Sequence, residues 1–145
     1  MNIDPNIWGP KLWESIDYII MGLPDYPTEI QKEKIYNFFM VLQYLLPCEK
    51  CRENYKEHIR NHPLTNDILS SKNNLMLWIV TIHNEVNKTL NKPLFTYEDF
   101  LDKNTKRLSI STGETNYIYV LVVIMIILII ILIIILVYNR HYIMG

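Results

Sequence analysis

The sequence of 145 residues contains no alanine, only 2 cysteines and no excess of charge of either sign. Two cysteines are too few for the disulfide framework that holds small secreted domains together. The 14 basic and 15 acidic residues give a net charge of −1, and the basic residues are scattered, which excludes a nucleic-acid-binding protein. No segment alternates apolar and polar residues as a strand does, and no repeat is visible. These absences favour a helical protein without a nucleic-acid partner.

The sequence does contain one long apolar run, at residues 117–138. Its 22 residues carry no charge and span about 33 Å as a helix, which is enough for the hydrocarbon core of a bilayer. Tyr117, Tyr119 and Tyr138 lie at its ends, where aromatic residues contact the membrane interface. The run predicts a single-pass transmembrane helix. Because it lies so near the C-terminus, we expect a tail-anchored protein whose preceding domain faces the cytosol.

Apolar residues recur at helical spacing in the first 103 residues. Glycine and proline interrupt this pattern, and residues 62–66 predict a loop between the third and fourth helices. Four helices with short connections imply a bundle. The sequence therefore predicts an all-α fold: a four-helix bundle with a short fifth helix in residues 1–103, a polar linker at 104–116, a transmembrane helix at 117–138 and a short tail at 139–145.

Capping side chains are predicted at three helix starts. Thr28 with Gln31 has the spacing of a capping box, and Thr96 is followed three residues later by an aspartate. Ser70 or Ser71 suits the start of the fourth helix.

Cys48 and Cys51 form a C-x-x-C motif directly after Pro47. The spacing of three residues places both sulfurs on one face of a helical turn, within reach of a disulfide. Pro47 favours the first turn of a helix, where free N–H groups stabilise a thiolate, and Lys50 adds a nearby cation. A thiol with a lowered pKa is what thiol–disulfide exchange requires at neutral pH. The motif therefore predicts a redox-active pair.

Other interpretations of the two cysteines stay open at this point. They can be inert, or they can bind zinc together with His58 and His62, although the central gap is shorter than in zinc fingers. A thioredoxin-like fold would need strands that alternate with helices, and none is visible.

Two further segments draw attention. His83, Asn84 and Asn87 gather beside the apolar stripe of the predicted fourth helix, a pattern that by itself favours a solvated face with one histidine at the edge of the core. Residues 8–13 read Trp-Gly-Pro-Lys-Leu-Trp; tryptophans at helical spacing are usually core, and Gly9 would allow the close approach of a ligand or a helix.

Together, and in this order, these segments resemble the Erv/ALR family of FAD-linked sulfhydryl oxidases, and the small viral members in particular. The likeness covers about residues 8–100 and includes W-G-P-K-L-W, L-P-C-E-K-C and W-I-V-T-I-H-N-E-V-N. The resemblance implies a helical bundle that holds FAD at one end and forms a homodimer.

The resemblance also implies roles for individual residues. Cys51 would be the thiol that reduces the flavin, and Cys48 the interchange thiol that the substrate attacks. Neither a metal site nor a metal cofactor is expected. The residues expected to contact FAD are Gly9, Lys11, Trp13, His83, Asn84, Val86, Asn87 and Lys92.

Three departures from the family pattern carry expectations of their own. Asp17 stands where many cellular members have a histidine, and we expect its carboxylate to turn away from the anionic cofactor or to bind differently. Ile59 and Tyr97 stand where those members have a structural disulfide. No shuttle cysteine pair is present beside Cys48 and Cys51. We therefore expect a separate protein dithiol, thioredoxin-like or a small C-x-x-C carrier, as the substrate, and oxygen as the acceptor that yields hydrogen peroxide.

The leading hypothesis is thus a tail-anchored, FAD-dependent thiol oxidase of a viral disulfide-formation pathway, in a host endomembrane or a virion membrane. The alternative from another class is a tail-anchored structural or adaptor bundle with a zinc-bound or inert C-x-x-C motif. A mitochondrial import oxidase fits less well, because the C-terminal anchor and the missing shuttle pair both depart from it.

Overall fold

The computed structural model describes residues 2–112 and 114–144, and the side chains of residues 2–109 and 117–140. The chain divides into two units, Met1–Asn104 and Thr105–Gly145, and each is described by itself. Every regular element within the described ranges is a helix, so the predicted all-α class is confirmed. In chain order the helices are α1 (Pro5–Met21), α2 (Glu29–Leu45), α3 (Glu49–Asn61), α4 (Asn66–Leu69), α5 (Lys72–Thr89), α6 (Tyr97–Thr112) and α7 (Glu114–Met144).

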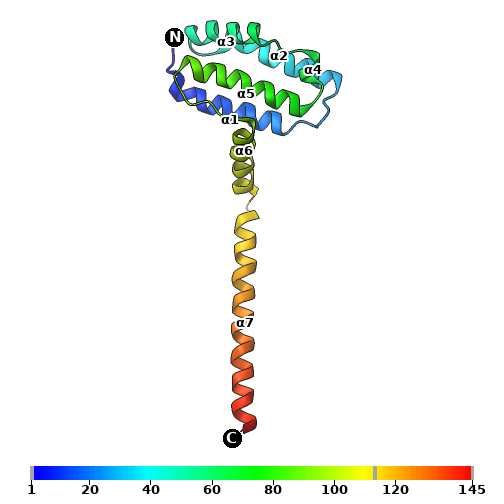
Figure 1. Ribbon diagram of the computed structural model, residues 1–145, viewed down its shortest axis with the longest axis vertical. Helices are drawn as coiled ribbons and strands as arrows, with labels where there is room; N and C mark the ends of the chain where they lie inside the picture. Colours follow the sequence, from blue (N-terminus) through cyan, green and yellow to red (C-terminus); the bar gives the residue numbers. More distant parts are fainter. Residues whose placement is uncertain (1, 113, 145) are drawn as a thin grey trace. The chain divides into compact units, whose positions relative to one another are not determined.

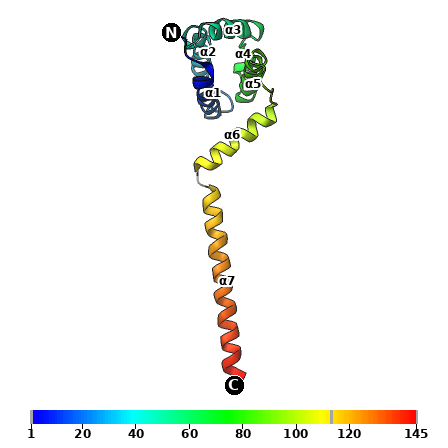
Figure 2. The same cartoon turned by 90° about the vertical axis from the view of Figure 1, so that its left-hand side faces the viewer.

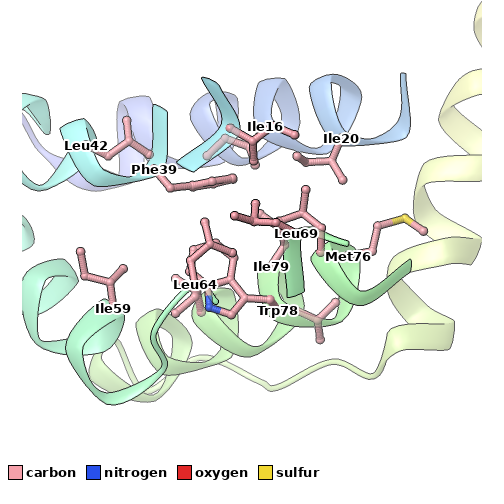
Figure 3. Packing of buried hydrophobic residues seen from close by; sticks show 14 of the residues in the cluster. Ile16, Ile20, Phe39, Leu42, Ile59, Leu64, Leu69, Met76, Trp78 and Ile79 are labelled. Atoms are coloured by element: carbon pink, nitrogen blue, oxygen red, sulfur yellow. The ribbon is translucent and has the colours of Figure 1, made fainter. Parts of the chain in front are cut away.

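The first unit is a bundle in which α5 packs against α1, α3 and α4. Helices α1 and α2 lie on one side of the bundle, α5 lies on the other, and α3 crosses between α2 and α5 (Figures 1 and 2). The apolar faces of these helices meet in one cluster, with Phe39 of α2 edge-on to Trp78 of α5 at a ring-centroid distance of 5.0 Å (Figure 3). This core brings the N-terminal end of α3 and the middle of α5 into one rigid unit.

The starts of the helices follow from the capping residues. Thr28 and Gln31 form the predicted capping box of α2, and Ser71, one of the two candidate serines, caps α5. Thr96 and Asp99 bond reciprocally at the start of α6, as predicted. These local hydrogen bonds satisfy N–H groups that the first turn of a helix leaves free.

Two expectations about helix boundaries are wrong. Residues 62–66 were predicted as a loop that precedes a helix capped by Ser70 or Ser71, but a short helix that was not predicted, α4, already starts at Asn66 with Thr65 as its cap. The fifth helix is not short, and residues 104–112 do not form an irregular linker, because α6 continues to Thr112. Residues 97–112 contain neither glycine nor proline, so nothing in their composition ends the helix earlier.

Helix α7 makes up most of the second unit. Residues Tyr117–Arg140 are long and apolar enough to cross a membrane by length and composition, and this span includes the predicted one. Its side chains are exposed throughout residues 117–140. The tail predicted at residues 139–145 is helical as far as Met144, so the helix does not end with the apolar run.

Candidate functional site

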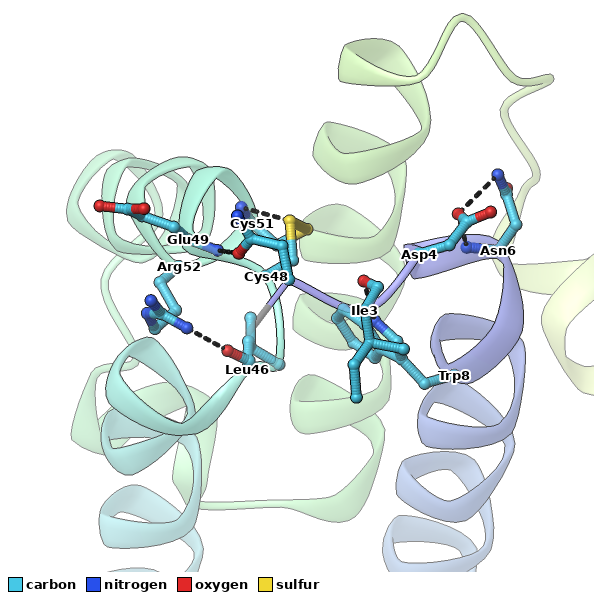
Figure 4. The surroundings of a disulfide bond; sticks show 10 residues. Ile3, Asp4, Asn6, Trp8, Leu46, Cys48, Glu49, Cys51 and Arg52 are labelled. Carbon is cyan, nitrogen blue, oxygen red and sulfur yellow. Dashed lines mark hydrogen bonds between the residues drawn. A yellow bond between two sulfur atoms is a disulfide. The ribbon is translucent and has the colours of Figure 1, made fainter.

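The C-x-x-C motif lies at the start of α3 and forms a disulfide between Cys48 and Cys51, whose Cα atoms are 5.1 Å apart (Figure 4). Cys48 is the N-cap residue of the helix, with φ −135° and ψ 124°, and its Sγ accepts a hydrogen bond from the backbone N–H of Cys51 at 3.2 Å. Pro47 was predicted to lie in the first turn of the helix, but it precedes the N-cap residue. The N–H of Cys51, in the first turn of the helix, nevertheless contacts the sulfur of Cys48.

The two cysteines differ in their surroundings. Both are half-buried, but Cys51 packs against the core cluster of the bundle, whereas Cys48 does not. Arg52, the next residue, donates from Nη1 to the carbonyl oxygen of Leu46 at 2.6 Å and so ties the start of α3 to the end of α2. Cys48 is thus the sulfur at the edge of the bundle, and Cys51 is the one turned toward its interior.

A second cluster lies between α1 and α5, where the ring of Trp13 stacks on the imidazole of His83. The ring centroids are 4.0 Å apart and the planes differ by 6°. Phe95 packs edge-on against the same imidazole at 4.8 Å. Burial, then the positive charges of Lys103 and Lys92, lower the pKa of His83 to about 4. His83 is therefore neutral at pH 7 and acts as an aromatic ring rather than a cation.

The other residues predicted to bind the cofactor lie on α1, on α5 and in the segment that follows α5. Lys11 is exposed on α1, and Val86 is half-buried on α5. A Cβ atom added at Gly9 would meet no atom within 4 Å, so the packing of this chain does not require a glycine there. Lys92 lies in the segment after α5, and its Nζ is 3.4 Å from Oδ1 of Asn6.

The two asparagines have partners that the sequence did not indicate. Asn84 donates to the carbonyl oxygen of Phe95 at 2.8 Å and accepts from the N–H of the same residue at 3.2 Å. The buried Asn87 donates to the carbonyl oxygen of Pro93 at 3.1 Å. Both side chains therefore hold residues 93–95 against α5, and they place Phe95 beside His83.

The two histidines of the zinc hypothesis face α5. His62 Nε2 lies 3.6 Å from Oε1 of Glu85, and His58 Nε2 lies 3.5 Å from the hydroxyl of Thr89. Burial lowers the pKa of His58. Among the side chains that the structure describes, those of residues 2–109 and 117–140, no group of three or more His, Cys, Asp or Glu is arranged to hold a metal ion.

Sequence analysis missed two residues that act on the aromatic stack. Phe95 and Lys103 act on His83 only because the chain returns to α5 after Asn91, and no local pattern in the sequence reveals this. Asp17, which stands at the position of the usual histidine, is 1% exposed and lies inside the bundle.

The site is thus a helical bundle that carries a redox-capable disulfide at a helix N-terminus and an aromatic stack flanked by lysines. Comparison with known proteins shows to which family this helical bundle belongs. The model of the Erv1 / Alr family matches residues 10–106, and the chain belongs to this family, as its motifs suggested.

Relatives and solved structures agree. The chain is 39% identical over 107 residues to a protein of Acanthamoeba polyphaga mimivirus named a probable FAD-linked sulfhydryl oxidase, and the match covers 74% of this chain and 75% of that one. It is 26% identical to the FAD-linked sulfhydryl oxidase of African swine fever virus, with coverage of 77% and 92%. The crystal structure of the FAD-binding domain of Erv1 from Saccharomyces cerevisiae matches with a TM-score of 0.64 and 25% identity, over 70% of this chain and 94% of that one.

Proposed function

We propose that this protein is an FAD-dependent thiol oxidase that forms disulfide bonds in a protein dithiol. The observation that carries the proposal is the Cys48–Cys51 disulfide at the N-terminal end of α3, in the same unit as the Trp13–His83 stack. Family membership supports it, because relatives of this chain are named FAD-linked sulfhydryl oxidases.

The cysteines perform the exchange with the substrate. A substrate thiolate attacks Sγ of Cys48, the bond between the two sulfurs breaks, and Cys51 leaves as a thiolate. The second substrate thiol, after losing its proton, attacks the substrate sulfur of the mixed disulfide and releases Cys48. The substrate has then lost two electrons, which the Cys48–Cys51 pair has gained. The hydrogen bond from the N–H of Cys51 to Sγ of Cys48 stabilises the negative charge as Cys48 leaves.

Residues around the aromatic stack fit the cofactor. Trp13 and neutral His83 offer aromatic surfaces to a planar ring system, and Lys11, Lys92 and Lys103 offer charges to a diphosphate. Open space at Gly9 leaves room beside α1. We assign Val86 to the same site, and we give Asn84 and Asn87 a supporting role through the segment that they hold. FAD held there would supply the two-electron acceptor through which the Cys48 and Cys51 thiols return to the disulfide, with Cys51 as the thiol next to the flavin, and would pass the electrons to oxygen to give hydrogen peroxide.

The partner is proposed to be a separate protein dithiol. The sequence has only 2 cysteines, and both belong to the redox pair. A thioredoxin-like protein or a small C-x-x-C carrier would present two thiols at the spacing that this exchange needs. Saturation kinetics with such a carrier, and slow turnover of unrelated thiol proteins, are the expected result.

We also propose that the bundle forms a homodimer. Helices α1 and α2 expose large apolar side chains, among them Tyr18, Ile19, Val41 and Tyr44. Exposed apolar surface of this kind is typical of protein–protein interfaces. Sedimentation equilibrium of the flavin-containing protein measures the mass directly, and a monomer at micromolar concentration would contradict this part of the proposal.

The apolar C-terminal helix supports the interpretation that the protein is anchored in a membrane. We propose that residues 117–138 span a host endomembrane or virion membrane, that the oxidase domain at residues 1–103 faces the cytosol, and that residues 104–116 connect the two. Protease added to permeabilised cells should digest the domain while internal membranes remain closed. Protection of the domain under these conditions would contradict the orientation.

The first test of the function is a visible absorption spectrum of the purified protein together with zinc analysis of the same sample. Flavin bands at about one equivalent per chain are expected, because the aromatic stack and the lysines favour a planar anionic ligand. Trp13→Ala should release most of the flavin. Tyr26→Ala, which removes an exposed aromatic ring of a loop, is the matched control. A colourless folded protein, with or without zinc on Cys48 and Cys51, would replace the oxidase with the adaptor bundle.

A further inference from the structure

Residues 2 and 3, called here the N-terminal strap, bind both peptide groups that flank Cys48. The N–H of Ile3 donates to the carbonyl oxygen of Pro47 at 3.0 Å, and Oδ1 of Asn2 accepts from the N–H of Glu49 at 3.0 Å. One short segment therefore holds the chain immediately before and immediately after the sulfur that the substrate attacks.

The strap is itself held by α1. The indole Nε1 of Trp8 donates to the carbonyl oxygen of Ile3 at 3.1 Å. Asp4, the next residue along, caps α1 by accepting from the N–H of Asn6 at 2.9 Å. Because both ends of the strap are tied to helices, the position of Cys48 depends on α1 as well as on α3.

The hydrogen bond from Glu49 to Asn2 has a chemical consequence. The N–H of Glu49 is one of the donors that the first turn of α3 leaves free, and such donors stabilise a thiolate at the helix start. While Oδ1 of Asn2 accepts from it, this donor is withheld from the Cys48 thiolate. The N–H of Cys51 still bonds to Sγ of Cys48. The strap thus favours the closed disulfide over the reduced pair.

We propose that Asn2 is a positioning residue that makes the Cys48–Cys51 disulfide harder to reduce by holding the N-cap of α3 and occupying the N–H of Glu49. The proposal rests on the proposed function only in giving Cys48 the role of attacked sulfur. Its effect on the disulfide equilibrium does not involve the flavin.

The test is the equilibrium of the full-length protein in detergent with glutathione under anaerobic conditions. Two glutathione thiols are oxidised to one glutathione disulfide while the Cys48–Cys51 bond is reduced to two thiols. The fraction reduced is measured by alkylation and mass spectrometry. Asn2→Ala should raise the equilibrium constant for reduction about fivefold, the size expected for loss of one hydrogen bond. Its alkylation rate should also rise at lower pH, because the thiolate gains a donor.

Three further variants make the test specific. Asn2→Asp keeps an acceptor for Glu49 and adds a negative charge, so its equilibrium constant should be at or below that of the wild type. Trp8→Phe removes the indole donor and should shift the constant in the same direction as Asn2→Ala, by less. Asn61→Ala, the same change at the other end of α3, should leave it unaltered.

An equilibrium constant for Asn2→Ala within 1.5-fold of the wild type would overturn the proposal, and so would an equal rise in Asn2→Ala and Asn2→Asp. The failure of the proposed function is a different result. A protein without flavin or oxidase activity would contradict the function and still show the effect of the strap, whereas an active flavoprotein with an unaltered constant would contradict only the strap.

Discussion

Isoleucine side chains help to form the buried core of the first unit, whereas those of residues 117–140 in the second unit are exposed. Ile79 in α5 of the bundle is 1% exposed, whereas Ile129 in α7 is 50% exposed, although both residues lie in regular helices. Helix α5 carries polar residues on one face and finds apolar neighbours for the other within its own unit. Within residues 117–138, α7 is apolar on every face. A helix of that kind needs an apolar environment that the chain itself does not provide, which is the physical argument for a membrane.

The chemically reactive side chains are also distributed unequally between the two units. The disulfide, the aromatic stack and the histidines with shifted pKa values all belong to the bundle. Between residues 117 and 138 the only titratable side chains are three tyrosines. The two units are therefore expected to respond to different mutations, and each prediction below tests that separation.

The largest contrast is expected in catalysis. Cys51→Ser should reduce thiol oxidation at least about 1000-fold, because no second thiol remains to complete the exchange. Deletion of residues 105–145 should leave kcat within about twofold, measured as oxygen consumption with a dithiol. Flavin should stay bound in Cys51→Ser, since that sulfur only borders the core. Normal turnover by this variant would refute the mechanism.

A contrast in stability comes next. Ile79→Ala should lower the free energy of unfolding of the bundle by about 3 kcal/mol, because it leaves a cavity in a fully buried position. Ile129→Ala, the matched change in α7, should alter it by less than about 0.5 kcal/mol. Urea unfolding in detergent, followed by tryptophan fluorescence, measures both, since all 3 tryptophans lie in the bundle. Equal effects would show that the units fold as one.

A charge placed in α7 should act only on the membrane. Ile129→Lys lies near the middle of the predicted span and should disfavour insertion by about 3 kcal/mol. Co-sedimentation with lipid vesicles should fall accordingly, while the thiol oxidase activity of the detergent-solubilised protein stays unaltered. Undiminished vesicle binding would argue that α7 packs against protein instead of lipid.

The smallest effect concerns pH. The pKa of His83 in the folded bundle is about 4, below its ordinary value of 6.5. Between pH 6.5 and pH 4, therefore, the imidazole is largely protonated in the unfolded chain and largely neutral in the folded bundle. The free energy of unfolding should therefore fall by about 2–3 kcal/mol as the pH drops from 6.5 to 4. His83→Asn should flatten this part of the profile, and His62→Asn is the control. Vesicle binding should stay constant, since residues 117–138 contain no histidine.

Several parts of the fold could be predicted because they depend on neighbours in the sequence. The capping pairs Thr28–Gln31 and Thr96–Asp99 act over three residues, and so does the Cys48–Cys51 disulfide. The predictions were wrong at helix boundaries that no strong local sequence signal marks. The polar composition after Asn104 suggested a linker, but a helix without glycine or proline simply continues to Thr112.

The candidate site, like the fold, has features that the sequence predicted and features that it did not. The sequence by itself determined the helices, the redox pair and the apolar run, because each depends on residues within a turn or two or on composition alone. Only the tertiary structure decided that Trp13 stacks on His83, that Asn84 binds the backbone of Phe95 instead of facing outward, and that Asn2 reaches Glu49. These contacts join residues up to 70 positions apart, so they depend on how the packed core orients α1, α3 and α5, which no local pattern encodes.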